Sequence, residues 1–142
     1  MSENTYYMER TKKLVLLVED TLFIHDLYAR SLRKAGYDVI SAMDGEESLR
    51  LAMQKPDLIL MDVMLPKMNG IEALRHLKSN PETADIPVVL LTNLTEDSII
   101  EQAFKIGAHG YILKVNLLPS QIKQAIQKFI EDPHFKEEFP PK

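Results

Sequence analysis

Leu14-Val-Leu-Leu-Val-Glu-Asp20 is the stretch that decides the fold. Its first five residues form a continuous apolar run, which is typical of a strand in a parallel sheet that is buried on both faces. Two carboxylates follow where such a strand would end. In open α/β sheets, ligands bind at the carboxyl ends of the strands, so this stretch predicts an α/β fold with a polar site at one edge of its sheet.

Four more short apolar runs follow, separated by stretches in which apolar residues recur with helical spacing. The predicted strands are 14–18, 37–42, 57–61, 86–91 and 109–113. The predicted helices begin near Thr21, Asp44, Gly70, Thr95 and Pro119. We expect side-chain caps from Asp20 or Thr21 on the first helix and from Thr95 on the fourth. Five strands that alternate with five helices predict a doubly wound parallel sheet with helices on both of its faces.

The composition sets limits on the class of protein. A chain of 142 residues predicts one domain, and 45% hydrophobic with 27% charged residues argues against disorder. A net charge of -4 without a basic stripe predicts no direct binding to nucleic acid or to an anionic membrane. The absence of cysteine excludes disulfides, thiol catalysis and zinc–thiolate sites. No stretch resembles a membrane span or a signal peptide, so we expect a cytoplasmic protein.

The chain divides into three parts. Residues 1–12 are a polar N-terminal leader, residues 13–131 form the domain, and residues 132–142 are a C-terminal tail or the start of a linker. The tail contains Phe135 and Phe139, which would be able to dock on the domain or on a partner. We nevertheless expect a poorly ordered terminus.

Polar residues follow the predicted strands at the points where the strands end. They are Glu19 and Asp20 after the first strand, Asp62 after the third, Thr92 and Asn93 at the end of the fourth, and Lys114 after the fifth. Three carboxylates at one sheet edge repel one another, and Mg²⁺ is the divalent cation that best suits such oxygen ligands. With Lys114 and Thr92 available for phosphoryl oxygens, Asp62 is expected to accept phosphate as an acyl phosphate.

On these residues the chain resembles the receiver domain of two-component response regulators, in particular the single-domain, chemotaxis-regulator-like type. The matching segments cover about residues 13 to 131 and are 14–20, 44–45, 57–66, 68–70, 90–92 and 107–114. Each segment alone is a weak signal of the family, whereas the occurrence of all of them in the same order at strand ends is a specific one. The resemblance implies a flavodoxin-like fold with strand order 2-1-3-4-5.

The resemblance also implies roles for individual residues. Asp62 would be the phosphorylation site and would take its phosphoryl group from a sensor histidine kinase or a phosphotransfer protein. Asp20, Asp62 and the backbone carbonyl of Met64 would bind Mg²⁺ directly, and Glu19 would hold the metal through water. Lys114 would pair with the phosphoryl oxygens.

The resemblance further implies a signalling switch, which catalyses only its own phosphorylation and dephosphorylation. Thr92 would turn inward to the phosphate, and Tyr111 would follow into the vacated space. The surface formed by the fourth helix, the fifth strand and the fifth helix would then change shape and select a downstream protein, whose identity the sequence does not give. The resemblance leaves room for a dimer that forms on phosphorylation.

Three residues depart from the usual family pattern or tune it. Val115 follows Lys114 in place of a proline, and we expect a trans bond there because a cis bond before a non-proline residue costs about 2.5–4 kcal/mol. Asn93 is larger than the residue usual at its position, so it would either narrow the access of phosphodonors or bond the phosphate. Met64 is apolar, and we expect it to position an attacking water poorly, so that the phosphorylated form is long-lived.

Two other classes of function use the same kind of fold or nucleophile. A phosphatase of the haloacid-dehalogenase kind would need a second aspartate two residues after Asp62, where this chain has Met64. A flavodoxin-like electron carrier would need a phosphate-binding loop after the first strand, where Glu19 and Asp20 would repel the phosphate of FMN. Both alternatives are disfavoured by these residues.

Overall fold

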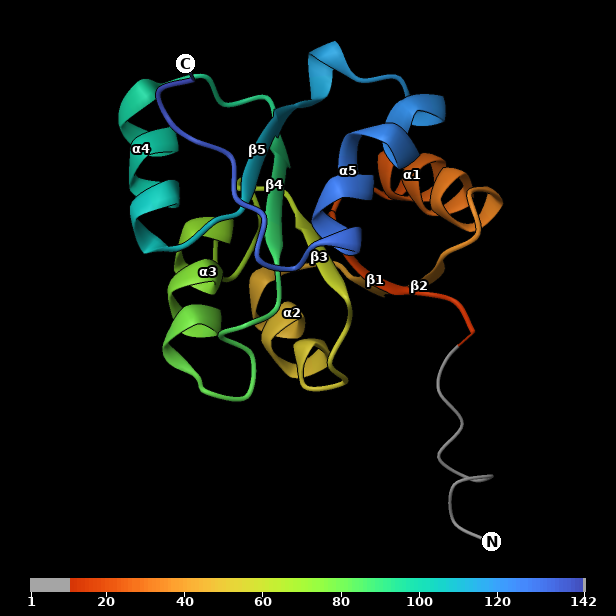
Figure 1. Cartoon of the computed structure of the whole chain (residues 1–142), viewed down its shortest axis with the longest axis horizontal. Coiled ribbons are helices and arrows are strands. Elements are labelled where there is room, and N and C mark those ends of the chain that lie inside the picture. Colours follow the sequence, from red (N-terminus) through yellow and green to blue (C-terminus); the bar gives the residue numbers. More distant parts are fainter. Residues whose placement is uncertain (1–10, 142) are drawn as a thin grey trace, which may run out of the picture.

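The computed structural model describes residues 11–141, in which the apolar runs pair into one five-stranded parallel sheet (Figure 1). The strands are β1 (Leu14–Val18), β2 (Asp38–Ala42), β3 (Leu58–Met61), β4 (Val88–Thr92) and β5 (Gly110–Leu113). Every residue of β1, β3 and β4 is buried, because continuous apolar runs can face helices on both sides of the sheet. The strand order is β2-β1-β3-β4-β5, so the predicted fold class and strand order are confirmed.

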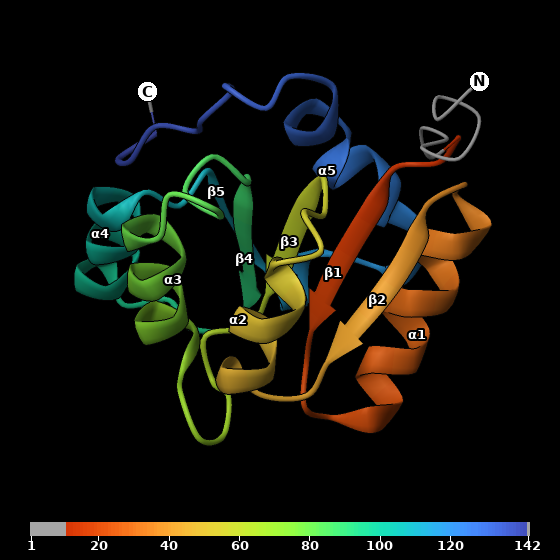
Figure 2. The same cartoon turned by 90° about the horizontal axis from the view of Figure 1, so that it is seen from below.

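Five helices cover the sheet, and they sort into two layers (Figure 2). They are α1 (Leu22–Lys34), α2 (Gly45–Ala52), α3 (Gly70–Ser79), α4 (Asp97–Ile106) and α5 (Ile122–Glu131). Successive side chains of a strand point to opposite faces, which divides the core in two. Leu16 and Ile59 pack with α2, α3 and α4 on one face, whereas Leu17 and Leu60 pack with α1 and α5 on the other.

The start of α2 agrees with the prediction from the sequence, because an aspartate side chain caps it. Asp44 accepts a hydrogen bond from the backbone N–H of Glu47, and this bond caps α2. The other expected caps differ. Thr21 precedes α1 without a side-chain cap bond, and α4 begins at Asp97 after Glu96, so the prediction of a Thr95 cap is wrong. Pro119 begins a short 3₁₀ turn (Pro119–Gln121), and α5 itself begins at Ile122.

The two ends of the chain can be compared with the predicted leader and tail. Most of the predicted leader, residues 1–10, lies outside the described residues. The tail docks on the domain, since the ring of Phe135 packs on that of Phe129 and the ring of Phe139 stacks on that of Phe104. Residues 132–141 therefore do not form the poorly ordered terminus that we expected. Among the described helices, none combines the length and the apolar character that crossing a bilayer requires.

His109 lies just before β5 and is buried, with 5% of its surface exposed. Its backbone N–H donates to the carbonyl of Val88, which fixes the start of the β4–β5 pairing. Burial, together with the positive charges of Lys78 and Lys136, lowers the pKa of His109 to about 4. The imidazole is therefore neutral in the folded protein at pH values where an unfolded chain would protonate it.

This burial predicts a pH-dependent stability. Between pH 6.5 and about 4 the unfolded chain binds a proton that the folded chain excludes, so the free energy of unfolding should fall as the pH falls. We expect wild type to lose on the order of 2 kcal/mol more over this range than His109→Gln, which carries no titrating ring. Urea denaturation at several pH values measures the difference. The matched control is His76→Gln at an exposed position of α3, and equal slopes in wild type and His109→Gln would contradict the prediction.

Candidate functional site

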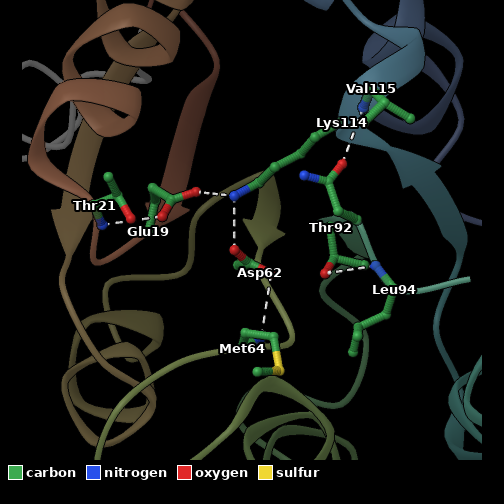
Figure 3. A network of polar contacts seen from close by, with 9 residues as sticks. Glu19, Thr21, Asp62, Met64, Thr92, Leu94, Lys114 and Val115 are labelled. Carbon is green, nitrogen blue, oxygen red and sulfur yellow. Dashed lines mark hydrogen bonds and ion pairs between the residues drawn. The ribbon is translucent and has the colours of Figure 1, made fainter.

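The polar residues that follow the strands meet at the carboxyl edge of the sheet (Figure 3). Glu19 follows β1 and Asp62 follows the neighbouring central strand β3, while Lys114 follows the edge strand β5. The parallel pairing of Val18 with Met61 places Glu19 and Asp62 at the same height of the sheet. Residues that are far apart in sequence are thus brought together because their strands run in the same direction and end at one edge.

Lys114 joins the two carboxylates. Its ammonium donates to Oδ2 of Asp62 over 2.7 Å and also to Oε1 of Glu19 (Figure 3). All three side chains are largely removed from solvent, with exposed fractions of 12% for Lys114, 4% for Glu19 and 9% for Asp62. Burial alone would lower the pKa of Lys114, but its hydrogen bonds to Asp62 and Glu19 outweigh burial and raise it. The lysine is therefore firmly protonated between two carboxylates.

Backbone N–H groups hold the other oxygen of each carboxylate. Oε2 of Glu19 accepts from the N–H of Thr21 at 3.0 Å, and Oδ1 of Asp62 accepts from the N–H of Met64 at 3.2 Å (Figure 3). Each carboxylate thus has one oxygen on Lys114 and one on its own following turn. This arrangement fixes the orientation of Asp62 before any ligand arrives, which lowers the reorganisation that a reaction would require.

Gly70 lets α3 approach the turn after Asp62. The N–H of Gly70 donates to the carbonyl of Val63 over 2.8 Å. A Cβ at this position would lie 2.3 Å from the backbone oxygen of Asp62 and 2.8 Å from Cα of Val63, closer than real contacts allow. The glycine in the Met68-Asn-Gly70 segment is thus required for the shape of the site.

Thr92 and Tyr111 both contact the loop after β4. Thr92 is buried, and its Oγ1 accepts from the N–H of Leu94 at 3.4 Å (Figure 3). The hydroxyl of Tyr111 donates to the carbonyl of Leu94 over 2.9 Å. Burial and the negative charges of Glu96 and Asp62 raise the pKa of Tyr111 to about 12, so its hydroxyl keeps the proton that it donates. The two residues predicted to form the switch are therefore connected through Leu94.

Asn93 and Val115 join the loops after β4 and β5. Oδ1 of Asn93 accepts from the backbone N–H of Val115 at 3.0 Å, so the side chain of Asn93 binds the loop after β5. Lys114–Asn116 form a 3₁₀ turn. In the described part of the chain only Phe139–Pro140 is cis, so the Lys114–Val115 bond is trans as predicted.

The ion pairs of the site join Lys114 to Glu19 and Asp62, and Asp20 is not one of their partners. Its side chain is exposed, and within residues 11–141 no three histidine, cysteine or acidic side chains form a ready metal-binding group. Lys114 instead supplies the positive charge between Glu19 and Asp62. The chemistry of the donors still suits a hard cation, since Glu19, Asp20 and Asp62 carry three negative charges against one on Lys114.

Two neighbours of the site had no role in the sequence analysis. Tyr28 of α1 is buried, and burial raises its pKa while the charges of Lys114 and Glu19 act on it in opposite directions. Glu137 of the tail accepts from the backbone N–H of Tyr111 at 3.2 Å. An aromatic residue on a helix gives no local signal of its distance from a charged site, and no local pattern in the tail indicates a contact with β5.

Comparisons with known proteins agree on one family. The family model described as "Response regulator receiver domain" matches residues 15–127. The DNA-binding dual master transcriptional regulator RpaA of Synechocystis sp. is 43% identical over 101 residues, which are 70% of this chain and 42% of that protein. This chain therefore spans less than half the length of that curated relative.

Two solved structures are similar over most of the chain. One is the phosphorylated cyanobacterial phytochrome response regulator RcpA, with 29% identity and a TM-score of 0.75 over 90% of this chain and 100% of that one. The other is the Mn(2+)-bound form of response regulator Rcp1, with 27% identity and a TM-score of 0.72 over 89% of this chain and 99% of that one.

The ion-paired cluster predicts a large effect of removing its cation. Lys114→Met would leave Glu19 and Asp62 buried side by side without a positive charge, and we expect the free energy of unfolding to fall by on the order of 3 kcal/mol. Urea denaturation at neutral pH measures this loss. Lys123→Met, at an exposed position of α5, is the matched control and should change stability by no more than about 0.5 kcal/mol. Equal losses in the two variants would refute the structural role of Lys114.

Proposed function

Because this chain belongs to the response regulator receiver domain family, we propose that it is a signalling switch in which Asp62 accepts a phosphoryl group. The donor is the phosphohistidine of a sensor histidine kinase or of a phosphotransfer protein. The observation that carries the proposal is the buried Asp62 at the end of the central strand, with Oδ2 on Lys114 and Oδ1 on the N–H of Met64. A carboxylate held in this way is oriented for attack on phosphorus.

The chemical step exchanges one bond to phosphorus for another. A carboxylate oxygen of Asp62 forms a bond to phosphorus, the bond from phosphorus to the imidazole nitrogen breaks, and the histidine leaves with its electron pair. Lys114 then moves its hydrogen bond from Oδ2 to a phosphoryl oxygen, and the hydroxyl of Thr92 donates to another. Charge-assisted hydrogen bonds of this kind contribute about 1.5–3 kcal/mol each, which is enough to shift a two-state equilibrium.

We propose that Mg²⁺ supports this step. Asp62, Asp20 and the backbone carbonyl of Met64 would hold it directly, and Glu19 would hold it through water. Bound there, the metal supplies positive charge for the phosphoryl oxygens. The proposal is supported by the excess of negative charge on Glu19, Asp20 and Asp62, and by the Mn(2+)-bound form of the similar regulator Rcp1.

A protein partner for phosphoryl transfer is supported by the surface around Asp62. Exposed apolar side chains occur on three of the segments that carry the site, namely Leu22 and Phe23 after Thr21, Met64 after Asp62, and Val115 and Leu118 after Lys114. A rim of apolar side chains around a charged centre suits docking of another protein better than capture of a small anion. We propose the cytoplasm as the site of this exchange.

The output of the switch is proposed to be the surface formed by α4, β5 and α5. Thr92 and Tyr111 both bind Leu94, so a movement of the Thr92 hydroxyl toward phosphate would change the contact that holds Tyr111. The downstream partner is then a protein that binds the phosphorylated and the unphosphorylated arrangement of this surface differently. A second copy of this chain is one such partner. We propose no direct contact with nucleic acid, since the chain carries a net charge of -4 and no basic stripe.

A phosphatase is the second function considered, and it fits the site less well. Met64 stands two residues after Asp62, where such an enzyme needs an acid, and its thioether cannot donate a proton. The two classes differ in turnover, because a switch takes up one phosphoryl group and a phosphatase releases many.

Phosphorylation of Asp62 is tested with a small phosphodonor. On incubation with acetyl phosphate and Mg²⁺, we expect intact-mass measurement to show a gain of one phosphoryl group. Asp62→Asn should show none, because an amide is a poor nucleophile. The matched control is Asp38→Asn, an exposed position at the start of β2, which should be modified like wild type. Unmodified wild type, or continuous release of phosphate from many esters, would overturn the proposal.

Met64 is predicted to lengthen the life of the phosphorylated form. Its side chain is 64% exposed beside Asp62 and has no group that can orient an attacking water. For Met64→Asn we expect dephosphorylation about tenfold faster than wild type, equivalent to about 1.4 kcal/mol of barrier. The decay of the phosphorylated mass after removal of acetyl phosphate measures the rate. Met53→Asn, at another exposed methionine, is the control, and an unchanged rate in Met64→Asn would contradict the prediction.

A further inference from the structure

The tail residues 133–139, called the strap below, run from the end of α5 past β5 to α4 (Figures 1 and 2). A turn after α5 sets their direction, since the N–H of Phe135 donates to the carbonyl of Asp132 and the N–H of His134 donates to the Asp132 side chain. The strap therefore lies on the three elements proposed above as the output surface.

Glu137 binds the open edge of the sheet. β5 is an edge strand with β4 as its neighbour, so its other side needs partners for backbone groups. The N–H of Glu137 donates to the carbonyl of His109 over 2.8 Å, and Oε1 of Glu137 accepts from the N–H of Tyr111 at 3.2 Å. These bonds bracket Gly110, where a Cβ would lie 2.5 Å from Cζ of Phe129 and 2.8 Å from Oε1 of Glu137. The glycine leaves room for both the core ring and the strap.

Aromatic and ionic contacts hold the strap on both sides of this bond pair. Toward α5, the ring of Phe135 packs on Phe129 with 5.3 Å between centroids, and Nζ of Lys128 lies over both rings. The same ammonium pairs with Oε2 of Glu137 at 3.3 Å. Toward α4, the ring of Phe139 stacks on Phe104 at 6.0 Å. The contacts are specific, but each is weak enough to break and reform.

Tyr111 connects the strap to the site. Its backbone N–H donates to Glu137, while its hydroxyl donates to the carbonyl of Leu94 in the loop that also binds Thr92. A rearrangement of Thr92 and Tyr111 therefore disturbs a bond that holds the strap. The hydroxyl of Tyr111 thus binds the loop next to the site, and its backbone N–H binds the strap on the outer face.

We propose that the strap is an autoinhibitory element that covers the α4–β5–α5 face while Asp62 is unmodified and leaves it on phosphorylation. A partner that uses this face has access to the edge of β5 and to Phe104 only after the strap is displaced. The proposal rests on the proposed function, because it takes the modification of Asp62 as the trigger. By linkage, a docked strap must weaken the binding of a phosphoryl group or its analogue at Asp62.

A reversible staple tests this linkage. The chain has no cysteine, so Phe104→Cys with Phe139→Cys introduces one unique pair, which a short cleavable cross-linker with two thiol-reactive ends can join. The probe is beryllofluoride with Mg²⁺, an analogue of the aspartyl phosphate. We expect its dissociation constant to rise about fivefold or more with the staple closed and to fall again after cleavage, since allosteric couplings begin near that size. The single variant Phe139→Cys, treated with the same reagent, is the control.

A second pair of variants covers the case in which the cysteine protein does not fold. Glu137→Ala removes both carboxylate contacts of the strap, whereas Glu137→Gln keeps an oxygen that can accept from Tyr111. We expect Glu137→Ala to bind the probe more tightly than wild type and to exchange the amide hydrogens of residues 134–139 faster, with Glu137→Gln in between. Probe binding that is unaffected by the staple and by Glu137→Ala would overturn the strap alone. A wild type that binds no probe and takes no phosphoryl group would overturn the proposed function and the strap with it.

Discussion

The ammonium of Lys114 between two buried carboxylates is the interaction on which the site depends. Glu19 and Asp62 follow adjacent strands, so parallel pairing forces their charges together at an edge with little exposure to water. Such a pair is costly without a positive charge, because water no longer screens the repulsion. Lys114, from the far side of the sheet, supplies that charge. Both carboxylates therefore share the same ammonium as their partner.

Rigid and adaptable parts of the molecule are divided along the strand ends. The strands themselves are buried and paired, and they fix where Asp62 and Lys114 stand. Side-chain hydrogen bonds hold the loops beyond them, as between Tyr111 and Leu94 or between Val115 and Asn93. In the proposed switch, charge added at Asp62 would act on a fixed framework, and the loops around it would adjust. This division is what a switch requires, since the loop contacts can change without loss of the core.

The edge strand β5 connects the inner site with the outer face. Lys114 follows its carboxyl end, Tyr111 lies within it, and Gly110 at its start accepts the close approach of Glu137. An edge strand leaves backbone groups available for pairing, and in this chain the strap occupies them. The same strand thus carries Lys114 of the site at one end and the contacts with the strap along its side.

The sequence by itself determined the strands, most helix positions and the residues that stand at each strand end, because apolar periodicity and turn residues are local patterns. It also indicated Asp62 and Lys114 as members of one site. Tertiary structure alone decided which polar atoms pair: Lys114 with Glu19 across 95 residues, Asn93 with Val115, and Tyr111 with Glu137 across 26 residues. Apolar periodicity in the sequence indicates whether a residue is buried. The partner of a buried charge or of a tail residue depends instead on how helices and strands that are distant in sequence pack together. For that reason the contacts of the docked tail could not be predicted.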